Sequence, residues 1–171
     1  IKRSVNLDPL NPKFNARLGM ANFYLRKDKE SEYSYRTALA INNEDYNTHY
    51  NLGELYLSWS DDGDKLDDVR QNTAKALNSY LECLQLNGDH TYAHYKVGMI
   101  LNGNGQHKEA IQHLQKTIEK IPNYVPALLQ IALAYEQLDR IDDAKMYYTL
   151  AYEEDPFNRI ILQKYNKYDH L

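Results

Sequence analysis

Apolar residues between Thr91 and Asn123 follow a helical spacing in two blocks, which a short glycine-containing stretch separates. The blocks consist of Tyr92, Tyr95, Val97, Gly98 and Leu101, and then of Ala110, Ile111, Leu114, Ile118 and Ile121. Between them, Gly103-Asn104-Gly105 permits the backbone angles of a tight turn, because glycine lacks a Cβ atom. Pro122 closes the second block, since proline disfavours helix in the residue before it. The stretch predicts a helix, a turn and a second helix.

The same two-helix pattern recurs along the chain every 34 residues, and one interval is longer by 11 residues. Small residues recur where the two helices of a unit must approach closely, at Gly19, Gly53, Gly98 and Ala132. Turn residues recur at the end of each unit, at Asn43, Gly88, Pro122 and Pro156. The agreement predicts four repeats, at 12–45, at 46–90 with an 11-residue insertion near 60–70, at 91–124 and at 125–158. In the first repeat we expect the first helix to end near Arg26 and the second to run from about Ser31 to Ile41. In the second repeat we expect a long second helix from about Leu66 to Leu86.

This pattern resembles the tetratricopeptide repeat, a helix-turn-helix unit of 34 residues with an L-G-x-x-Y motif, a central alanine and a late proline. The segments that carry the resemblance are Leu52-Gly53-Glu54-Leu55-Tyr56 and Ile131-Ala132-Leu133-Ala134-Tyr135. The resemblance covers nearly the whole chain. It implies an all-α fold, a right-handed superhelical array (α-solenoid) of helix-turn-helix repeats.

Both ends of the chain are similar to parts of further repeats. Asp8-Pro9 falls one period before Asn43, so we expect residues 1–11 to be the end of a preceding repeat. An ordinary N-terminus that caps the first repeat is the alternative. Residues 159–171 have the length of one more helix, with Asn166 at the position of the small residue. They form either a capping helix with a polar face or a truncated repeat.

The net charge of −4 and the single cysteine narrow the classes of function. An acidic chain argues against a nucleic-acid-binding surface, which is normally basic. No apolar run approaches the roughly 18 residues of a membrane span, so we expect no membrane insertion. Cys83 cannot form a disulfide within the chain, and its small-residue position favours a buried packing role. The compartment stays open, with a soluble, cytoplasmic protein slightly favoured.

Catalytic and metal-binding motifs are absent from the sequence: there is no phosphate-binding glycine loop, no H-E-x-x-H and no G-x-S-x-G. His90 and His94 have the spacing of zinc ligands, but no third ligand lies nearby, and ordinary surface histidines are favoured. Aspartates surround Gly63, and a calcium loop would take its oxygen ligands from alternate positions before the glycine, here Ser58, Ser60 and Asp62. Val69, however, stands where such a loop needs glutamate, which favours a solvated acidic turn. We expect no enzyme activity, no cofactor and no metal.

The family resemblance implies that the first helix of each repeat lines a concave groove that binds peptides. The positions that would line the groove are Met20, Phe23, Tyr24, Tyr50, Asn51, Glu54, Tyr92, Tyr95, Lys96, Met99, Leu129 and Leu133, together with Leu57, Asn102, Gln130 and Glu136. Tyrosine and methionine are typical of adaptable recognition surfaces. The alternative for several of them is a place in the core between repeats.

One subclass of the family binds the acidic C-terminal tails of heat-shock chaperones through a two-carboxylate clamp. Asn51 and Lys96 match positions of that clamp, but Ala16, Met20 and Tyr92 replace its other polar and basic groups. We therefore expect a different partner. The favoured function is a non-catalytic scaffold that binds a protein or peptide segment in the groove. The alternatives are a docking or regulatory array of a larger protein with an enzymatic domain elsewhere, and self-association through the groove or the array ends.

Overall fold

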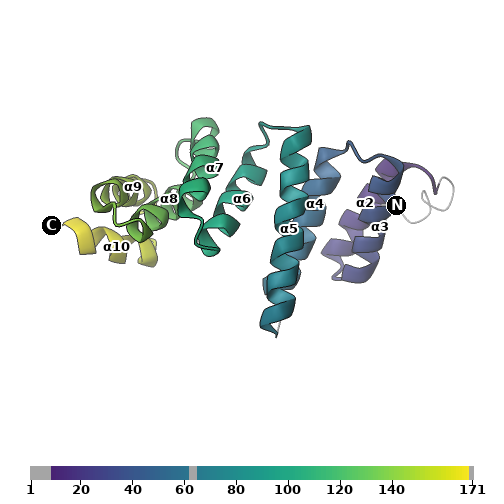
Figure 1. The fold of residues 1–171 in the computed structure, drawn as a ribbon, viewed down its shortest axis with the longest axis horizontal. Helices are drawn as coiled ribbons and strands as arrows, with labels where there is room; N and C mark the ends of the chain where they lie inside the picture. Colours follow the sequence, from purple (N-terminus) through teal and green to yellow (C-terminus); the bar gives the residue numbers. More distant parts are fainter. Residues whose placement is uncertain (1–8, 62–64, 170–171) are drawn as a thin grey trace. The chain divides into compact units, whose positions relative to one another are not determined.

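A computed structural model describes residues 9–61 and 65–169, which form nine α-helices and contain no β-strand (Figure 1). The helices are α2 (Pro12–Tyr24), α3 (Asp28–Ile41), α4 (Tyr46–Asp61), α5 (Leu66–Leu86), α6 (Thr91–Gly103), α7 (His107–Lys120), α8 (Val125–Gln137), α9 (Ile141–Glu154) and α10 (Arg159–Asp169). The predicted all-α helical repeat is confirmed. The expected helix end before Asp8, the centre of the acidic turn at 62–64 and the last two residues lie outside the described residues.

The chain divides into two compact units, Ile1–Ala93 and His94–Leu171. In the N-terminal unit the pairs α2–α3 and α4–α5 each pack closely at a glycine. A Cβ atom on Gly19 would lie 2.6 Å from Cδ1 of Tyr35, and one on Gly53 would lie 2.6 Å from Cε1 of Tyr80. Both tyrosines are fully buried. The small residues at these positions therefore make room for an aromatic ring from the second helix of the pair.

The turn between α2 and α3 begins earlier than the sequence predicts. The first helix was expected to end near Arg26, but α2 ends at Tyr24, and Arg26 has a φ of 56°, in the left-handed region. The second helix was expected from about Ser31, but α3 begins at Asp28. Asp28 and Glu30 lie in its first turn, where carboxylates interact favourably with the helix dipole.

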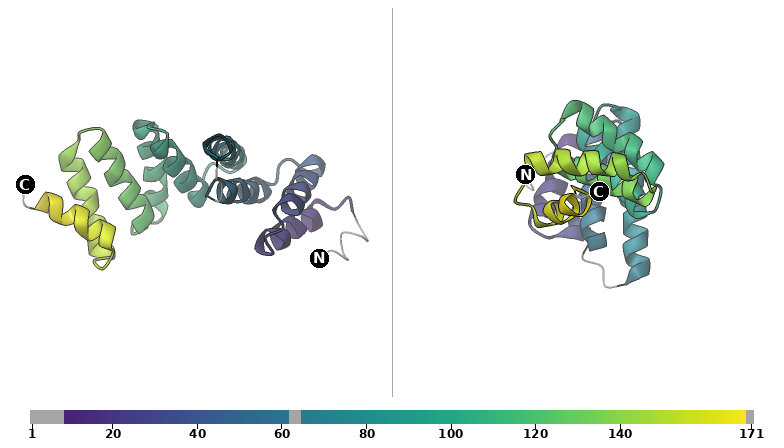
Figure 2. Two further views of the ribbon diagram at one scale, coloured as in Figure 1. Left: turned by 90° about the horizontal axis from the view of Figure 1, so that it is seen from below. Right: turned by 90° about the vertical axis from the view of Figure 1, so that its left-hand side faces the viewer.

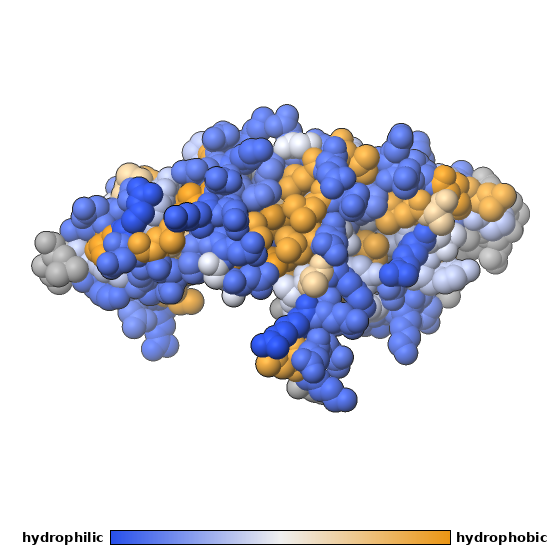
Figure 3. Space-filling model, in the orientation of Figure 1, coloured by the Kyte–Doolittle hydropathy of each residue, from blue (hydrophilic) through white to orange (hydrophobic). Residues whose placement is uncertain are grey.

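The inserted residues of the second repeat mostly lengthen its helices. The second helix begins at Leu66 and ends at Leu86, as predicted, and α4 has 16 residues where α2, α6 and α8 have 13. The hydroxyls of Ser60 on α4 and Thr73 on α5 lie 2.8 Å apart, so a hydrogen bond joins the two extensions. The face of α5 that is visible in Figure 3 is mostly hydrophilic, as expected for a helix with one solvated side. Cys83 is fully buried in α5, so its packing role is confirmed.

In the C-terminal unit, α9 contacts both α8 and α10, and the three lie side by side in Figure 2. A Cβ atom on Gly98 would lie 2.6 Å from Cγ of Leu114 and 3.0 Å from the carbonyl oxygen of Ala110, which confirms the predicted helix contact there. Gly105 has a φ of 81°, as the predicted turn requires. Among the residues that the structure describes, no helix combines the length and the apolar character needed to cross a bilayer.

Candidate functional site

A hollow among the predicted groove positions lies in the C-terminal unit, on the face made by α6 and α8. It is an open depression of about 470 Å³, lined by Met99, Asn102, Gly103, Gly105, His107, Gln130, Leu133 and Gln137. Met99 and Leu133 are two of the predicted groove residues, and Asn102 and Gln130 occupy two further predicted positions. A depression of this size accommodates one or two side chains of a bound segment.

Hydrogen bonds hold the polar wall of this depression in place. The side-chain amide of Asn102 donates to the backbone oxygen of Gln130 at 3.1 Å and to its Oε1 at 2.9 Å. Nδ1 of His107 lies 2.6 Å from Oδ1 of Asn102. Because its amide is fixed from both sides, Asn102 joins the two first helices α6 and α8. The sequence analysis did not predict His107 or Gln137 as lining residues. His107 is the first residue of α7, and Gln137 is the last residue of α8.

The predicted groove residues of the N-terminal unit differ in exposure. On α2, Met20 is 41% exposed and Tyr24 is 76% exposed, while Phe23 is half-buried and lies edge-on to Tyr24. On α4, Tyr50, Asn51 and Glu54 are all half-buried. The α2 residues are thus more accessible to a partner than those of α4.

Aromatic neighbours occupy much of the surface of Tyr50. Its ring centroid lies 4.7 Å from that of His90 and 5.6 Å from that of Tyr80, and the Tyr80 hydroxyl donates to Glu54. Truncating Tyr50 would therefore remove packing inside the unit as well as any contact with a ligand. This arrangement favours a structural contribution beside the predicted binding role.

The remaining predicted residues lie on α6 and α8. Tyr92 is 49% exposed. Tyr95, Lys96 and Leu129 are half-buried, and the ring of Tyr95 lies edge-on to that of Tyr124 at 5.1 Å. Of the predicted set, the structure brings together Met99 and Leu133 in one depression, while Tyr95 and Leu129 are not among its lining residues.

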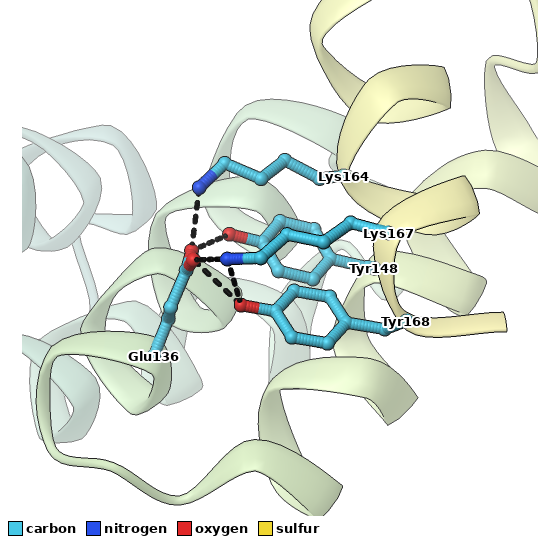
Figure 4. A network of polar contacts seen from close by, with 5 residues as sticks. All are labelled: Glu136, Tyr148, Lys164, Lys167 and Tyr168. Atoms are coloured by element: carbon cyan, nitrogen blue, oxygen red, sulfur yellow. Dashed lines mark hydrogen bonds and ion pairs between the residues drawn. The ribbon is translucent and has the colours of Figure 1, made fainter. Parts of the chain in front are cut away.

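Glu136, at the last predicted groove position of α8, is bound within the unit by α9 and α10 (Figure 4). Its carboxylate accepts hydrogen bonds from the hydroxyls of Tyr148 at 2.7 Å and Tyr168 at 2.6 Å. The ammonium groups of Lys164 and Lys167 donate to it at 2.7 and 2.9 Å. Burial alone would raise the pKa of Glu136, but these four donors hold it well below its usual range. This side chain therefore fixes α10 to the repeat before it.

His90 and His94, which have the sequence spacing of zinc ligands, make different contacts in the structure. Nδ1 of His90 accepts the backbone N–H of Ala93 at 3.1 Å and so caps the start of α6. His94 is buried, and its Nδ1 lies 2.9 Å from Nδ1 of His113 on α7. Burial, followed by the charges of His94 and Lys116, lowers the pKa of His113 to about 4. Within the described ranges, no three histidine, cysteine or acidic side chains are grouped as a metal site would require.

The hydroxyls that a calcium loop would use are engaged within the helices. Ser58 Oγ donates to the carbonyl of Leu55, and Ser60 pairs with Thr73. Val69 lies half-buried in the first turn of α5. Asp62, Gly63 and Asp64, which complete the acidic stretch, lie outside the described residues.

Comparison with known proteins points to one repeat family. The sequence pattern of the tetratricopeptide repeat matches residues 101–159. The photosystem I assembly protein Ycf3 of Acaryochloris marina is 33% identical in an alignment of 113 residues that covers 60% of this chain and 67% of that protein. The human superkiller complex protein 3 is 32% identical over 108 residues, 62% of this chain. That match spans only 6% of the human protein.

Two further similarities concern an enzyme and the fold. The UDP-N-acetylglucosamine–peptide N-acetylglucosaminyltransferase of Giardia intestinalis is 29% identical over 84 residues, 49% of this chain and 6% of that protein. Among solved structures, the MamA protein superposes with a TM-score of 0.74 at 23% identity, covering 98% of this chain and 82% of MamA. At that identity the superposition concerns the helical repeat fold alone.

Proposed function

The chain belongs to the tetratricopeptide repeat family, and we propose that it binds a peptide or protein segment on the face of its first helices and is not catalytic. Membership in this family supports a role as a protein-interaction scaffold. The observation that carries the proposal is the depression between α6 and α8. There the apolar Met99 and Leu133 adjoin the amides of Asn102 and Gln130. Apolar surface beside a few fixed polar groups is the usual character of a binding pocket.

The chemistry of the lining favours an extended segment with one apolar side chain. Met99 is flexible and polarisable, so it adapts to differently shaped apolar groups. The amides of Gln130 and Gln137 are able to donate to and accept from a peptide backbone. An extended backbone presents both kinds of group, so a segment that inserts an aliphatic or aromatic side chain between Met99 and Leu133 satisfies the whole lining.

The test begins with a partner segment obtained by cross-linking in the source cell and mass spectrometry, which is then synthesised. Met99→Ala is expected to weaken its binding by about 1–3 kcal/mol, the range for truncating an interface anchor. Met146→Ala is the matched control, because Met146 is 49% exposed on the second helix α9 and should bind like the wild type. If the two variants bound the segment with equal affinity, the binding face would not be the one made by α6 and α8.

A second candidate function is that of a docking array within a larger enzyme. The similarity to the Giardia transferase is the observation that favours it. Sequencing the complete gene tests it, because a catalytic domain must then precede or follow these residues. Self-association is separated from both by light scattering of the purified chain, which reports a mass that rises with concentration if copies bind one another.

A further inference from the structure

We infer that the N-terminal unit carries a second binding site, at the α2–α3 turn and the end of α4, and that it takes an acidic peptide segment with one aliphatic or aromatic anchor residue. The site is a hollow of about 520 Å³, lined by Arg26, Lys27, Asp28, Lys29, Glu30 and Trp59. It lies at the turn between the helices of the first repeat, and none of its lining residues is a predicted groove position.

The apolar wall of the hollow comes from the lengthening of α4. Trp59 lies in the extra turn that gives α4 its 16 residues, beyond the 13 of α2, α6 and α8. Its ring is half-buried and lies edge-on to Tyr56, with centroids 5.6 Å apart. Among the described residues, its indole N–H has no hydrogen-bond partner. A bound carbonyl or carboxylate would accept from this group while an apolar side chain packs against the ring.

The opposite wall is cationic and conformationally fixed. Arg26, Lys27 and Lys29 are all exposed, and they exceed the acidic Asp28 and Glu30 by one charge in a chain whose net charge is −4. Oδ1 of Asp28 is inaccessible to solvent and has no hydrogen-bond partner within the described residues. The backbone N–H groups of Arg26 and Lys27 donate to Phe23 and Asn22 at 3.0 and 2.9 Å. The turn is thus held in place before a ligand arrives, which lowers the cost of binding.

The C-terminal unit has a smaller hollow of the same construction. Tyr135 on α8 and Leu138, directly after it, have the spacing of Tyr56 and Trp59. Lys108 and Arg140 supply the cations around a volume of about 250 Å³. There Arg140 pairs with Asp143 at 2.7 Å and covers the Tyr135 ring at 4.7 Å, so its charge is partly neutralised. The lengthened repeat therefore has the larger hollow and an unpaired indole N–H, which is why we assign the ligand to it.

Trp59 is the only tryptophan of the chain, so its fluorescence reports on this hollow directly. The probe is a fluorescein-labelled peptide with a Leu-Phe pair flanked by glutamates, and an unlabelled copy is used for tryptophan emission. We expect saturable binding that shifts the emission of Trp59 and weakens as salt is added. A peptide with lysines in place of the glutamates, and one with a Gly-Gly pair in place of Leu-Phe, should bind at least roughly tenfold more weakly.

Variants assign the binding to the two walls. We expect two variants to bind the labelled peptide roughly tenfold more weakly, as measured by fluorescence polarisation: the double variant Lys27→Glu/Lys29→Glu and the single variant Trp59→Leu. The circular dichroism of both should be unchanged. Lys116→Glu/Lys120→Glu alters the same number of charges on α7 and should leave binding intact. Met99→Ala should also leave it intact, so failure here is distinguishable from failure of the groove proposal. Absence of saturable binding, or equal affinity for the acidic and basic peptides, overturns the inference.

Discussion

The helix pairs α4–α5 and α8–α9 contain the same buried tyrosine in two different settings. Tyr80 and Tyr148 are both fully buried on the second helix, and each donates its hydroxyl to a glutamate of the first helix, Glu54 or Glu136. In α4–α5 the ring of Tyr80 fills the space that a Cβ atom on Gly53 would need. In α8–α9 the corresponding small residue is Ala132, and the glutamate also accepts three donors from α10.

The difference shows that one repeat pattern can be stabilised in two ways. Steric fit between a glycine and an aromatic ring dominates the α4–α5 contact, because a single added methyl group has no room. A charged hydrogen-bond network dominates at α8–α9, because Glu136 is only 14% exposed and must keep its donors. Substitutions that add volume should therefore harm the first pair most, and substitutions that remove charge should harm the second.

Glu136→Ala should give the largest effect, a loss of about 2–4 kcal/mol in the free energy of unfolding. The substitution removes the acceptor of two tyrosine hydroxyls and two ammonium groups. Tyr148 and Tyr168 are buried, and a buried hydroxyl that loses its acceptor is costly. Chemical denaturation measures the loss. Hydrogen exchange should show that the amides of α10 lose protection first, because four contacts between α8, α9 and α10 meet at this carboxylate.

Glu153→Ala is the control for that experiment, since Glu153 is exposed on α9. It should leave both the midpoint of unfolding and the exchange of α10 unchanged. If Glu136→Ala were as stable as this control, the network in Figure 4 would not hold α10 in solution.

Gly53→Ala should destabilise the α4–α5 pair by about 1–3 kcal/mol, the usual cost of overpacking. The new methyl group would lie 2.6 to 2.9 Å from three atoms of the Tyr80 ring, which is fully buried and has little freedom to move. Gly103→Ala is the matched control on α6, because nothing lies within 4 Å of its added Cβ atom. Alanine is the better helix former, so that variant should be neutral or slightly stabilised. Equal losses in both variants would contradict the steric account.

The repeat period was sufficient to predict the helices and the close contacts, because both depend on local spacing. Gly98 opposite Leu114 and the buried Cys83 follow from the recurrence of small residues at fixed positions. Helix ends were less accurate: Arg26 takes a left-handed conformation after α2 because the turn starts before it. No sequence rule distinguishes that from one more helical residue.

The roles of individual polar residues could not be predicted, because they depend on which side chains meet from different repeats. Glu136 was assigned to the groove, but it binds Lys164 and Lys167, which lie 28 and 31 residues further along the chain. A signal did exist: the two lysines occupy the positions of Gln130 and Leu133 one period later, on the same side of a first helix. His94 and His113 were not paired in advance, since they lie on different helices of one repeat.

The smallest expected effect is a pH dependence of the free energy of unfolding, and it arises in the C-terminal unit. His113 has a pKa of about 4 in the folded chain, below its ordinary value of 6.5, because burial and the neighbouring His94 and Lys116 disfavour its charged form. The unfolded chain therefore binds more protons between these two values. The contribution of His113 to the free energy of unfolding is fully present above about pH 6.5 and declines as the pH falls toward 4. Glu136, whose pKa is also lowered, adds a further decline once the pH falls below the ordinary range of a glutamate.

His113→Gln tests this dependence, because glutamine keeps a polar group beside His94 but does not titrate. Denaturant midpoints measured from pH 7 to pH 4 should fall less steeply for His113→Gln than for the wild type, with the curves separating below about pH 6.5. Gln112→Ala changes the exposed neighbour on the same helix and should keep the wild-type slope. Combined with Glu136→Ala, His113→Gln should remove most of the acid sensitivity of the C-terminal unit. If the slope between pH 6.5 and 4 were unchanged in His113→Gln, this histidine would titrate in the folded chain as it does in the unfolded one.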